Sequence, residues 1–304
     1  MMTDAQHGRA RIVDVTPTRV REALDQGAIA IVAGFQGFNH DSKDITTLGR
    51  GGSDTTAVAL AAALDAEVCE IYTDVDGVYT CDPRVVPDAK KIDVIAYDEL
   101  LEMASSGSKV MQSRSVEFAK KFKVPFEVRS SFNNNRGTIV KEESIGLENV
   151  VVRGISLERK QAKVTITQVP DKPGTASRIF TALSEANVII DVIVQNVSVS
   201  GSTDISFTMG ADELEKLGPV IDRVAKDVGA GEVIKKSGIA KLSVVGIGMR
   251  SHSGVAATLF ECLGNGGVNI QMISTSEIKI AVIIDEAQIE HAAKLAHAAF
   301  GLAK

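Results

Sequence analysis

The sequence has no tryptophan, and aromatic residues make up only 4% of its 304 residues. Sites for single-stranded nucleic acid hold the bases mainly by stacking on aromatic rings, so this scarcity argues against such a site. Lysine and arginine form no run, and the net charge of −6 argues against a broad nucleic-acid-binding surface. We therefore expect no nucleic-acid partner.

Cysteines and long apolar runs are also scarce. Cys69, Cys81 and Cys262 are odd in number and lack metal-ligand spacing, which predicts free thiols in a reducing compartment. No apolar run approaches the length that spans a bilayer, and residues 1–11 lack the apolar core of a signal peptide. These absences predict a cytoplasmic protein with no membrane partner. The length of 304 residues allows two or three domains.

A glycine-rich loop at residues 47–54 is the clearest functional pattern, and the alanine-rich run behind it predicts a helix. Ser53 or Asp54 is expected to cap this helix, whose positive end would favour an anion. Arg50 adds donors suited to a carboxylate or phosphate. The loop is neither a P-loop nor a G-x-G-x-x-G motif. We interpret it as an anion site, and the alternative is a purely structural turn.

The neighbouring segments predict a layered α/β fold. Residues 28–33 form a continuous apolar run, which is typical of a buried parallel strand. A second strand at 67–72 leads into an acidic, glycine-containing segment at 73–84, where a tyrosine and an arginine could line a nucleotide. A helix is expected to open at 108–109, and because the helix dipole opposes a lysine there, Lys109 is assigned to a ligand phosphate. The β-α-β-α-β alternation up to residue 140 supports this fold class.

A repeat occupies the rest of the chain. Gly174 and Gly254, and Phe180 and Phe260, hold matching places in two β-α-β-β-α-β units. Each unit has a glycine loop before its first helix, and strands are expected at 188–194 and 268–273. The pattern predicts two small ligand-sensing domains, with structural duplication as the alternative. Residues 151–157 are expected to complete the sheet of the second unit.

These segments, taken in order, resemble the aspartate kinases, in which an amino-acid kinase domain precedes tandem ACT domains. The resemblance is nearest to the actinobacterial, lysine- and threonine-regulated type. It implies a three-layer α/β amino-acid kinase fold at residues 1–145 and two ferredoxin-like βαββαβ ACT domains at 146–235 and 236–304. It also implies ATP-dependent phosphorylation of the side-chain carboxylate of L-aspartate to 4-phospho-L-aspartate, for lysine, threonine and methionine biosynthesis.

The resemblance places three groups of site residues in this sequence. Arg50 and Ser53 are the catalytic residues, and they bind aspartate together with Gly51 and Gly52. The nucleotide-binding residues are Ser53, Thr73, Asp74, Tyr79, Arg84, Lys109 and Val110. The effector-binding residues are Asp171, Gly174, Ile190, Asp191, Gln195 and Asn196 in the first ACT unit, and Thr275, Ser276 and Glu277 in the second. No residue is assigned to a metal, because Mg²⁺ would be held mainly by the ATP phosphates.

The sequence departs from the family pattern at its start. Family members begin earlier, with a strand and a Lys-x-Gly-Gly phosphate loop, so the resemblance implies a kinase domain shortened at its N-terminus. A shortened gene model is the expected origin. The missing segment would carry the main catalytic lysine of the family. Loss of such a charge-neutralising cation lowers the rate by orders of magnitude, so the chain alone is expected to be inactive or nearly so. The alternative is a non-catalytic regulatory subunit. A homo-oligomer through the ACT domains, or a hetero-oligomer with a companion subunit, is expected.

Overall fold

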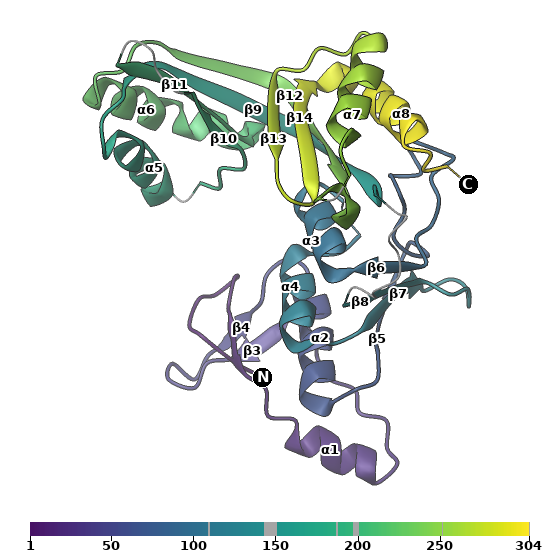
Figure 1. Ribbon diagram of the computed structural model, residues 1–304. Coiled ribbons are helices and arrows are strands. Elements are labelled where there is room, and N and C mark those ends of the chain that lie inside the picture. Colours follow the sequence, from purple (N-terminus) through teal and green to yellow (C-terminus); the bar gives the residue numbers. More distant parts are fainter. Residues whose placement is uncertain (109, 143–150, 187, 197–200, 251, 304) are drawn as a thin grey trace.

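Two α/β parts make up the chain, and Figure 1 shows one below the other. The computed structural model describes residues 1–108, 110–142, 151–186, 188–196, 201–250 and 252–303. We call the lower part, residues 1–142, the N-terminal unit. No described helix is long and apolar enough to cross a membrane.

A four-stranded sheet and three helices form the core of the N-terminal unit. The strands lie in the order β5-β7-β8-β6, in which β5/β7 and β6/β8 are parallel and β7/β8 are antiparallel. Alternate residues of β7 are buried, which turns Phe126 and Val128 into the core with Val58 and Leu100. The bounds are β5 Cys69–Thr73, β6 Val94–Ala96, β7 Phe126–Ser130, β8 Thr138–Lys141, α2 Gly52–Leu64, α3 Tyr97–Ser105 and α4 Ser113–Phe122.

A second, smaller sheet carries the N-terminal residues. Its order is β2-β1-β3-β4, and the hydroxyls of Thr3 and Thr46 are hydrogen bonded at 2.5 Å inside it. The strand β4 leads directly into the glycine loop, so this sheet fixes where that loop begins. The bounds are β1 Met2–Thr3, β2 Ile12–Asp14, α1 Thr18–Asp25, β3 Gln36–Phe38 and β4 Ile45–Thr47.

Three local expectations are corrected here. Residues 28–33 form no strand, and Ile29 and Ile31 are 91% and 96% exposed. An apolar run becomes a buried strand only beside a pairing backbone, and no described strand pairs with this one. The helix expected to open at 108–109 begins at Ser113 instead, so the helix-dipole argument for Lys109 loses its basis. The N-cap of α2 is Gly51, rather than Ser53 or Asp54.

One continuous six-stranded antiparallel sheet, in the order β10-β11-β9-β12-β14-β13, runs through both repeats. The expected strands at 188–194 and 268–273 are shorter and begin later than the apolar runs. The bounds are β9 Gly154–Pro170, α5 Thr175–Glu185, β10 Ile193–Gln195, β11 Ser202–Gly210, α6 Ala211–Asp227, β12 Val233–Val245, η1 Ile247–Arg250, α7 Val255–Asn265, β13 Met272–Thr275, β14 Lys279–Asp285, η2 Glu286–Gln288 and α8 Ile289–Ala299.

The two long central strands are shared between the repeats. Residues 154–158 of β9 pair with 241–245 of β12, and residues 163–166 of β9 pair with 233–236 of β12. The expectation that the segment near residues 151–157 completes the second sheet is therefore confirmed. We call residues 161–236 the first repeat unit, and residues 154–158 with 239–303 the second repeat unit. The expected boundary at 235/236 falls inside β12, and the boundary at 145/146 lies outside the described residues.

Candidate active site

The glycine loop takes a conformation that only glycine tolerates at two positions. Gly51 has a φ of 70°, and a Cβ built on it would lie 2.0 Å from Cγ of Gln112. Gly49 has a φ of 83°, and its Cβ would lie 2.5 Å from the carbonyl oxygen of Gly8. The loop is therefore held between the segment that precedes α4 and the N-terminal segment.

The start of α2 is open to a ligand. No side chain caps this helix, so amides of its first turn remain available to an anion. Arg50 and Ser53 are both exposed beside these amides, and burial raises the pKa of the Asp54 carboxyl. The arrangement brings the four residues predicted to bind aspartate, residues 50–53, into one turn.

Two residues that support the loop were not predicted. Arg114 on α4 donates to the carbonyl oxygens of Leu48 (2.8 Å) and Ala10 (2.7 Å), which ties the loop to the N-terminal segment. Gln112, the N-cap of α4, fills the space above Gly51. Because both contacts join residues far apart in the chain, no local pattern could reveal them.

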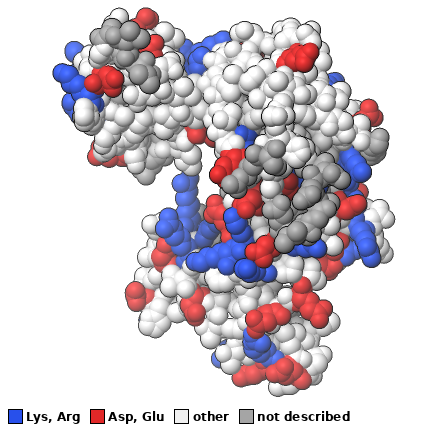
Figure 2. All heavy atoms as spheres, in the orientation of Figure 1, with Lys and Arg blue, Asp and Glu red and all other residues white. Residues whose placement is uncertain are grey.

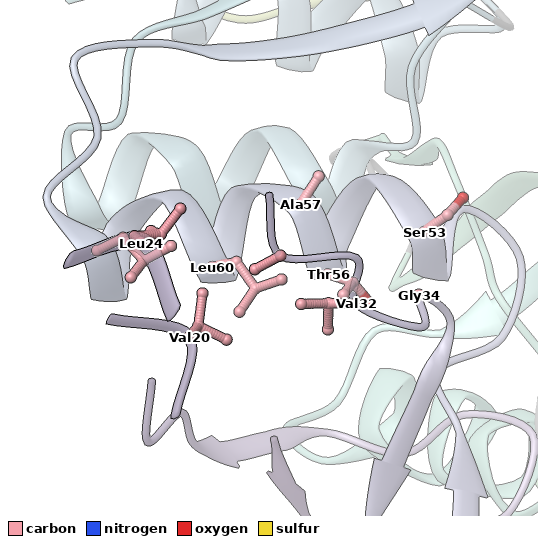
Figure 3. Close-up of a pocket in the computed structure, with 10 residues that line it drawn as sticks. Val20, Leu24, Val32, Gly34, Ser53, Thr56, Ala57 and Leu60 are labelled. Atoms are coloured by element: carbon pink, nitrogen blue, oxygen red, sulfur yellow. The ribbon is translucent and has the colours of Figure 1, made fainter. Parts of the chain in front are cut away.

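The face of α2 that leads away from the loop borders a cavity of about 470 Å³. Figure 3 shows Ser53 and Gly34 at one end of it and Leu24 at the other. Apart from Ser53 and Thr56, its lining is apolar or glycine, with Val20, Val32 and Leu60 among the lining side chains. A charged substrate does not fit such a wall, so the candidate anion site is the glycine loop rather than this cavity.

The loop after β5 makes its own internal contacts. The Thr73 hydroxyl donates to Asp74 at 3.1 Å, and the Tyr79 hydroxyl donates to Asp76 at 2.7 Å. Burial, followed by the contact with Asp76, raises the pKa of Tyr79 to about 12. Because this loop follows the carboxyl end of β5, it lies where open α/β sheets bind ligands.

The remaining predicted nucleotide residues differ in exposure. Arg84 is 84% exposed, and its Nε and Nη2 donate to the two carboxylate oxygens of Asp82 at 3.0 and 2.8 Å. This guanidinium holds the pKa of the Asp82 carboxyl below its usual range. Val110 is half-buried against the core of the N-terminal unit, and Lys109 lies outside the described residues.

Basic side chains gather over the upper part of the N-terminal unit, below the first repeat unit, as Figure 2 shows. A surface of this sign attracts anionic substrates. The described residues contain no group of three or more His, Cys, Asp or Glu that could hold a metal ion.

The chain was compared with known proteins. The amino acid kinase family profile matches residues 2–130, and ACT domain profiles match residues 163–225 and 242–300. The aspartokinase of Mycolicibacterium smegmatis is 50% identical over 306 residues, which cover 99% of this chain and 73% of that relative. This chain belongs to the aspartokinase family. The predicted fold, an amino-acid kinase domain followed by two ACT domains, is confirmed with it.

Two solved structures of the Escherichia coli aspartokinase III resemble this chain. The complex with aspartate and ADP (R-state) has a TM-score of 0.77 at 28% identity, and the complex with lysine and aspartate (T-state) has a TM-score of 0.73 at 29% identity. Each match covers 98% of this chain and 67% of the other.

The predicted effector residues lie near opposite edges of the six-stranded ACT sheet. Gly174, with a φ of 90°, is the N-cap of α5, and a Cβ there would meet open space. The exposed Asp171 precedes it, and the backbone N–H of Asp171 donates to the Gly201 carbonyl at 3.0 Å. Edge strand β10 and the residues beside it hold Ile190, Asp191, Gln195 and Asn196. At the other edge Thr275 ends β13, and Ser276 and Glu277 follow it.

One effector residue already has a partner inside the protein. Asp191 forms an ion pair with Lys241, whose Nζ also lies 2.7 Å from Oε2 of Glu158. The Lys241 side chain is 1% exposed, so it joins the first repeat unit to β12 through a buried charge. No local sequence pattern indicates this contact, because its three residues come from separate parts of the chain.

Proposed function

We propose that this chain acts as an aspartate kinase that transfers the γ-phosphoryl group of ATP to the side-chain carboxylate of L-aspartate. An oxygen of the carboxylate attacks the γ-phosphorus, the bond to the β-phosphate oxygen breaks, and 4-phospho-L-aspartate and ADP result. The observation that carries this proposal is the uncapped start of α2, with Arg50 and Ser53 exposed beside it, in a member of the aspartokinase family.

The residues at this site suit such a transfer. A carboxylate needs no general base, so catalysis rests on positioning and on neutralising charge in the transition state. Arg50 presents a planar fork of donors that fits a carboxylate or a phosphoryl group. The first-turn amides of α2 would hold phosphoryl oxygens, and residues 73–84 would hold the nucleotide. Mg²⁺, bound by the nucleotide phosphates, would supply further neutralisation.

We also propose regulation by lysine and threonine at the two edges of the ACT sheet. The lysine complex of the E. coli relative supports lysine as an effector, and threonine follows from the resemblance in sequence. Edge strand β10 and the segment before it expose Ile193 (52%) and Ile189 (73%). Pairing through this edge would cover them, which supports an oligomer. The free thiols of all three cysteines support a cytoplasmic, biosynthetic role.

A regulatory subunit without activity of its own is the second candidate. It is favoured by the exposure of Ile29 and Ile31, which leaves an apolar surface on the N-terminal unit uncovered. By contrast, every strand of the ACT sheet has a partner. The two candidate functions share the effector sites and differ in whether this chain itself catalyses phosphoryl transfer.

The test is formation of acyl phosphate by the purified chain, trapped with hydroxylamine in the presence of ATP, Mg²⁺ and aspartate. Turnover that lysine plus threonine suppress would support the kinase assignment and would overturn the expectation, from the sequence alone, of a chain with little or no activity. Arg50→Ala should then lower kcat by about 10²–10³-fold. Arg19→Ala, an exposed arginine on α1, is the matched control and should leave the rate unchanged. No turnover, with lysine and threonine still binding by calorimetry, would refute the kinase assignment for this chain and support the regulatory subunit.

A further inference from the structure

The middle of the loop that follows β5 is anchored on the second repeat unit, whereas Val78 and Ile92, at its two ends, are buried in the core of the N-terminal unit. Cys81, Val86 and Ala89 are buried in the same apolar cluster as Leu259 and Ile289, which belong to the second repeat unit. The backbone continues this attachment, because the Ile155 N–H donates to the Thr80 carbonyl at 2.7 Å and Ala89 forms an isolated antiparallel bridge with Ala303.

The buried hydroxyl of Thr80 lies at the centre of this contact between the loop and the second repeat unit. The Thr80 hydroxyl donates to the carbonyl oxygen of Leu302 at 3.1 Å and accepts from the Lys90 N–H at 3.0 Å. It also lies 3.0 Å from Nε2 of His297 on α8, and the two residues are 7% and 2% exposed. Since the single hydroxyl hydrogen serves Leu302, Nε2 of His297 carries a proton and donates to Thr80.

This contact satisfies every group that takes part in it. Burial lowers the pKa of His297, so its ring is neutral at pH 7 and Nε2–H serves as the donor. Without the hydroxyl, Nε2–H, the Leu302 carbonyl and the Lys90 N–H would all lose a partner in a buried place. Unsatisfied buried groups cost more than the hydrogen bonds themselves contribute.

We propose that the C-terminal segment of the second repeat unit, α8 with residues 300–303, is a positioning element for residues 73–91, and that it acts through the Thr80 hydroxyl. The inference rests on the proposed function in one respect, which is that this loop binds the nucleotide. Two of the predicted nucleotide residues belong to this stretch, because Tyr79 directly precedes Thr80 and Arg84 lies between Cys81 and Val86. A displacement of α8 would therefore move the nucleotide-binding side chains directly.

The experiment compares Thr80→Val, which removes the hydroxyl and keeps the shape, with Thr80→Ser, which keeps the hydroxyl. Limited trypsin digestion reports the order of the loop through cleavage after Arg84 and Lys90, with cleavage after Arg19 on α1 as the internal reference. Calorimetry with Mg-ADP reports nucleotide affinity. For Thr80→Val we expect both loop cleavages to accelerate by about tenfold or more and ADP affinity to fall by about tenfold, whereas Thr80→Ser should match the native chain.

A second pair of variants, at His297, distinguishes loss of this hydrogen bond from general unfolding. His297→Gln replaces the imidazole N–H donor by an amide N–H donor, whereas His297→Leu leaves no donor at this place. Only His297→Leu should therefore behave like Thr80→Val. Equal cleavage rates in Thr80→Val and the native chain would overturn the proposal. So would faster cleavage with unchanged ADP affinity. If the native chain binds no ADP, the proposed function fails at this loop, while the digestion comparison still supports or refutes the anchor.

Discussion

The buried ammonium of Lys241 offers a quantitative test of how the two repeat units are joined. Its side chain is 1% exposed, whereas those of its partners Glu158 and Asp191 are 30% and 31% exposed. Burial by itself lowers the pKa of Lys241, but the two carboxylates more than offset this, so its pKa lies above the ordinary 10.5. One charge is therefore fully enclosed, whereas the side chains of its two counter-charges are partly exposed, although Oε2 of Glu158 is itself buried.

This asymmetry sets the order of the mutational effects. Lys241→Met removes the enclosed charge and leaves two carboxylates on partly exposed side chains, so we expect a loss of about 1–2 kcal/mol, below the ~3–5 kcal/mol for breaking a buried pair. Glu158→Gln combined with Asp191→Asn leaves the enclosed ammonium without a counter-charge, and its cost should approach ~3–5 kcal/mol. Either carboxylate change alone leaves one partner in place and should cost less than the pair.

The measurement is urea unfolding at pH 7, followed by circular dichroism. Lys235→Met is the matched control on the same strand, because Lys235 pairs with Asp222 at 2.6 Å on the surface and should contribute less than about 1 kcal/mol. The raised pKa of Lys241 implies stability that is fully present below pH 10.5 and lost as pH rises through the higher folded value. A double carboxylate variant no less stable than Lys241→Met would refute the reasoning.

Further predictions concern the glycine loop, the contact between units and a thiol. Gly51→Ala should destabilise the chain by ~1–2 kcal/mol through left-handed strain, with an added clash against Gln112 that Gln112→Ala relieves, measured as Tm. Glu99→Gln should cost ~1.5–3 kcal/mol in urea unfolding, because buried Glu99 holds Nε of Arg153 at 3.1 Å, and an unchanged midpoint would contradict this. Burial raises the pKa of Cys81 to about 12, so a thiol reagent at pH 8 should label it only after unfolding, and immediate labelling would count against its burial.

Local patterns identified much of this structure from the sequence. The helix behind the glycine loop, strand β5 and the helices of both repeats were predicted because each has a periodicity or a boundary signal of its own. Gly51 was singled out because a tight turn needs glycine, and its φ of 70° agrees. The glycine loop was placed correctly at the start of α2, although Gly51 itself is the N-cap.

Features that depend on contacts between residues far apart in the chain could not be predicted from local sequence patterns. Residues 28–33 have the composition of a buried strand, but composition cannot say whether a neighbouring strand is present, and Ile31 is exposed. Helix α4 begins only at Ser113, and before it Gly107 lies against Leu157 of the second repeat unit while Gln112 lies against Gly51 of the glycine loop, two contacts that local sequence does not reveal. The anchoring of Thr80 by His297 joins residues that are 217 positions apart.

The geometry of the shared strands determines how an effector in the first repeat unit can reach the active site. Figure 1 shows that unit projecting away from the N-terminal unit, whereas the second unit contacts α3, where Lys279 pairs with Glu102 at 2.6 Å. A signal must therefore cross along β9 and β12. Both strands are irregular at the crossing, with positive φ at Lys160 (56°) and Gly238 (71°) and register shifts beside them. A bulge bends and twists a strand, so we expect any rotation of the first unit to be taken up there, next to the buried charge of Lys241.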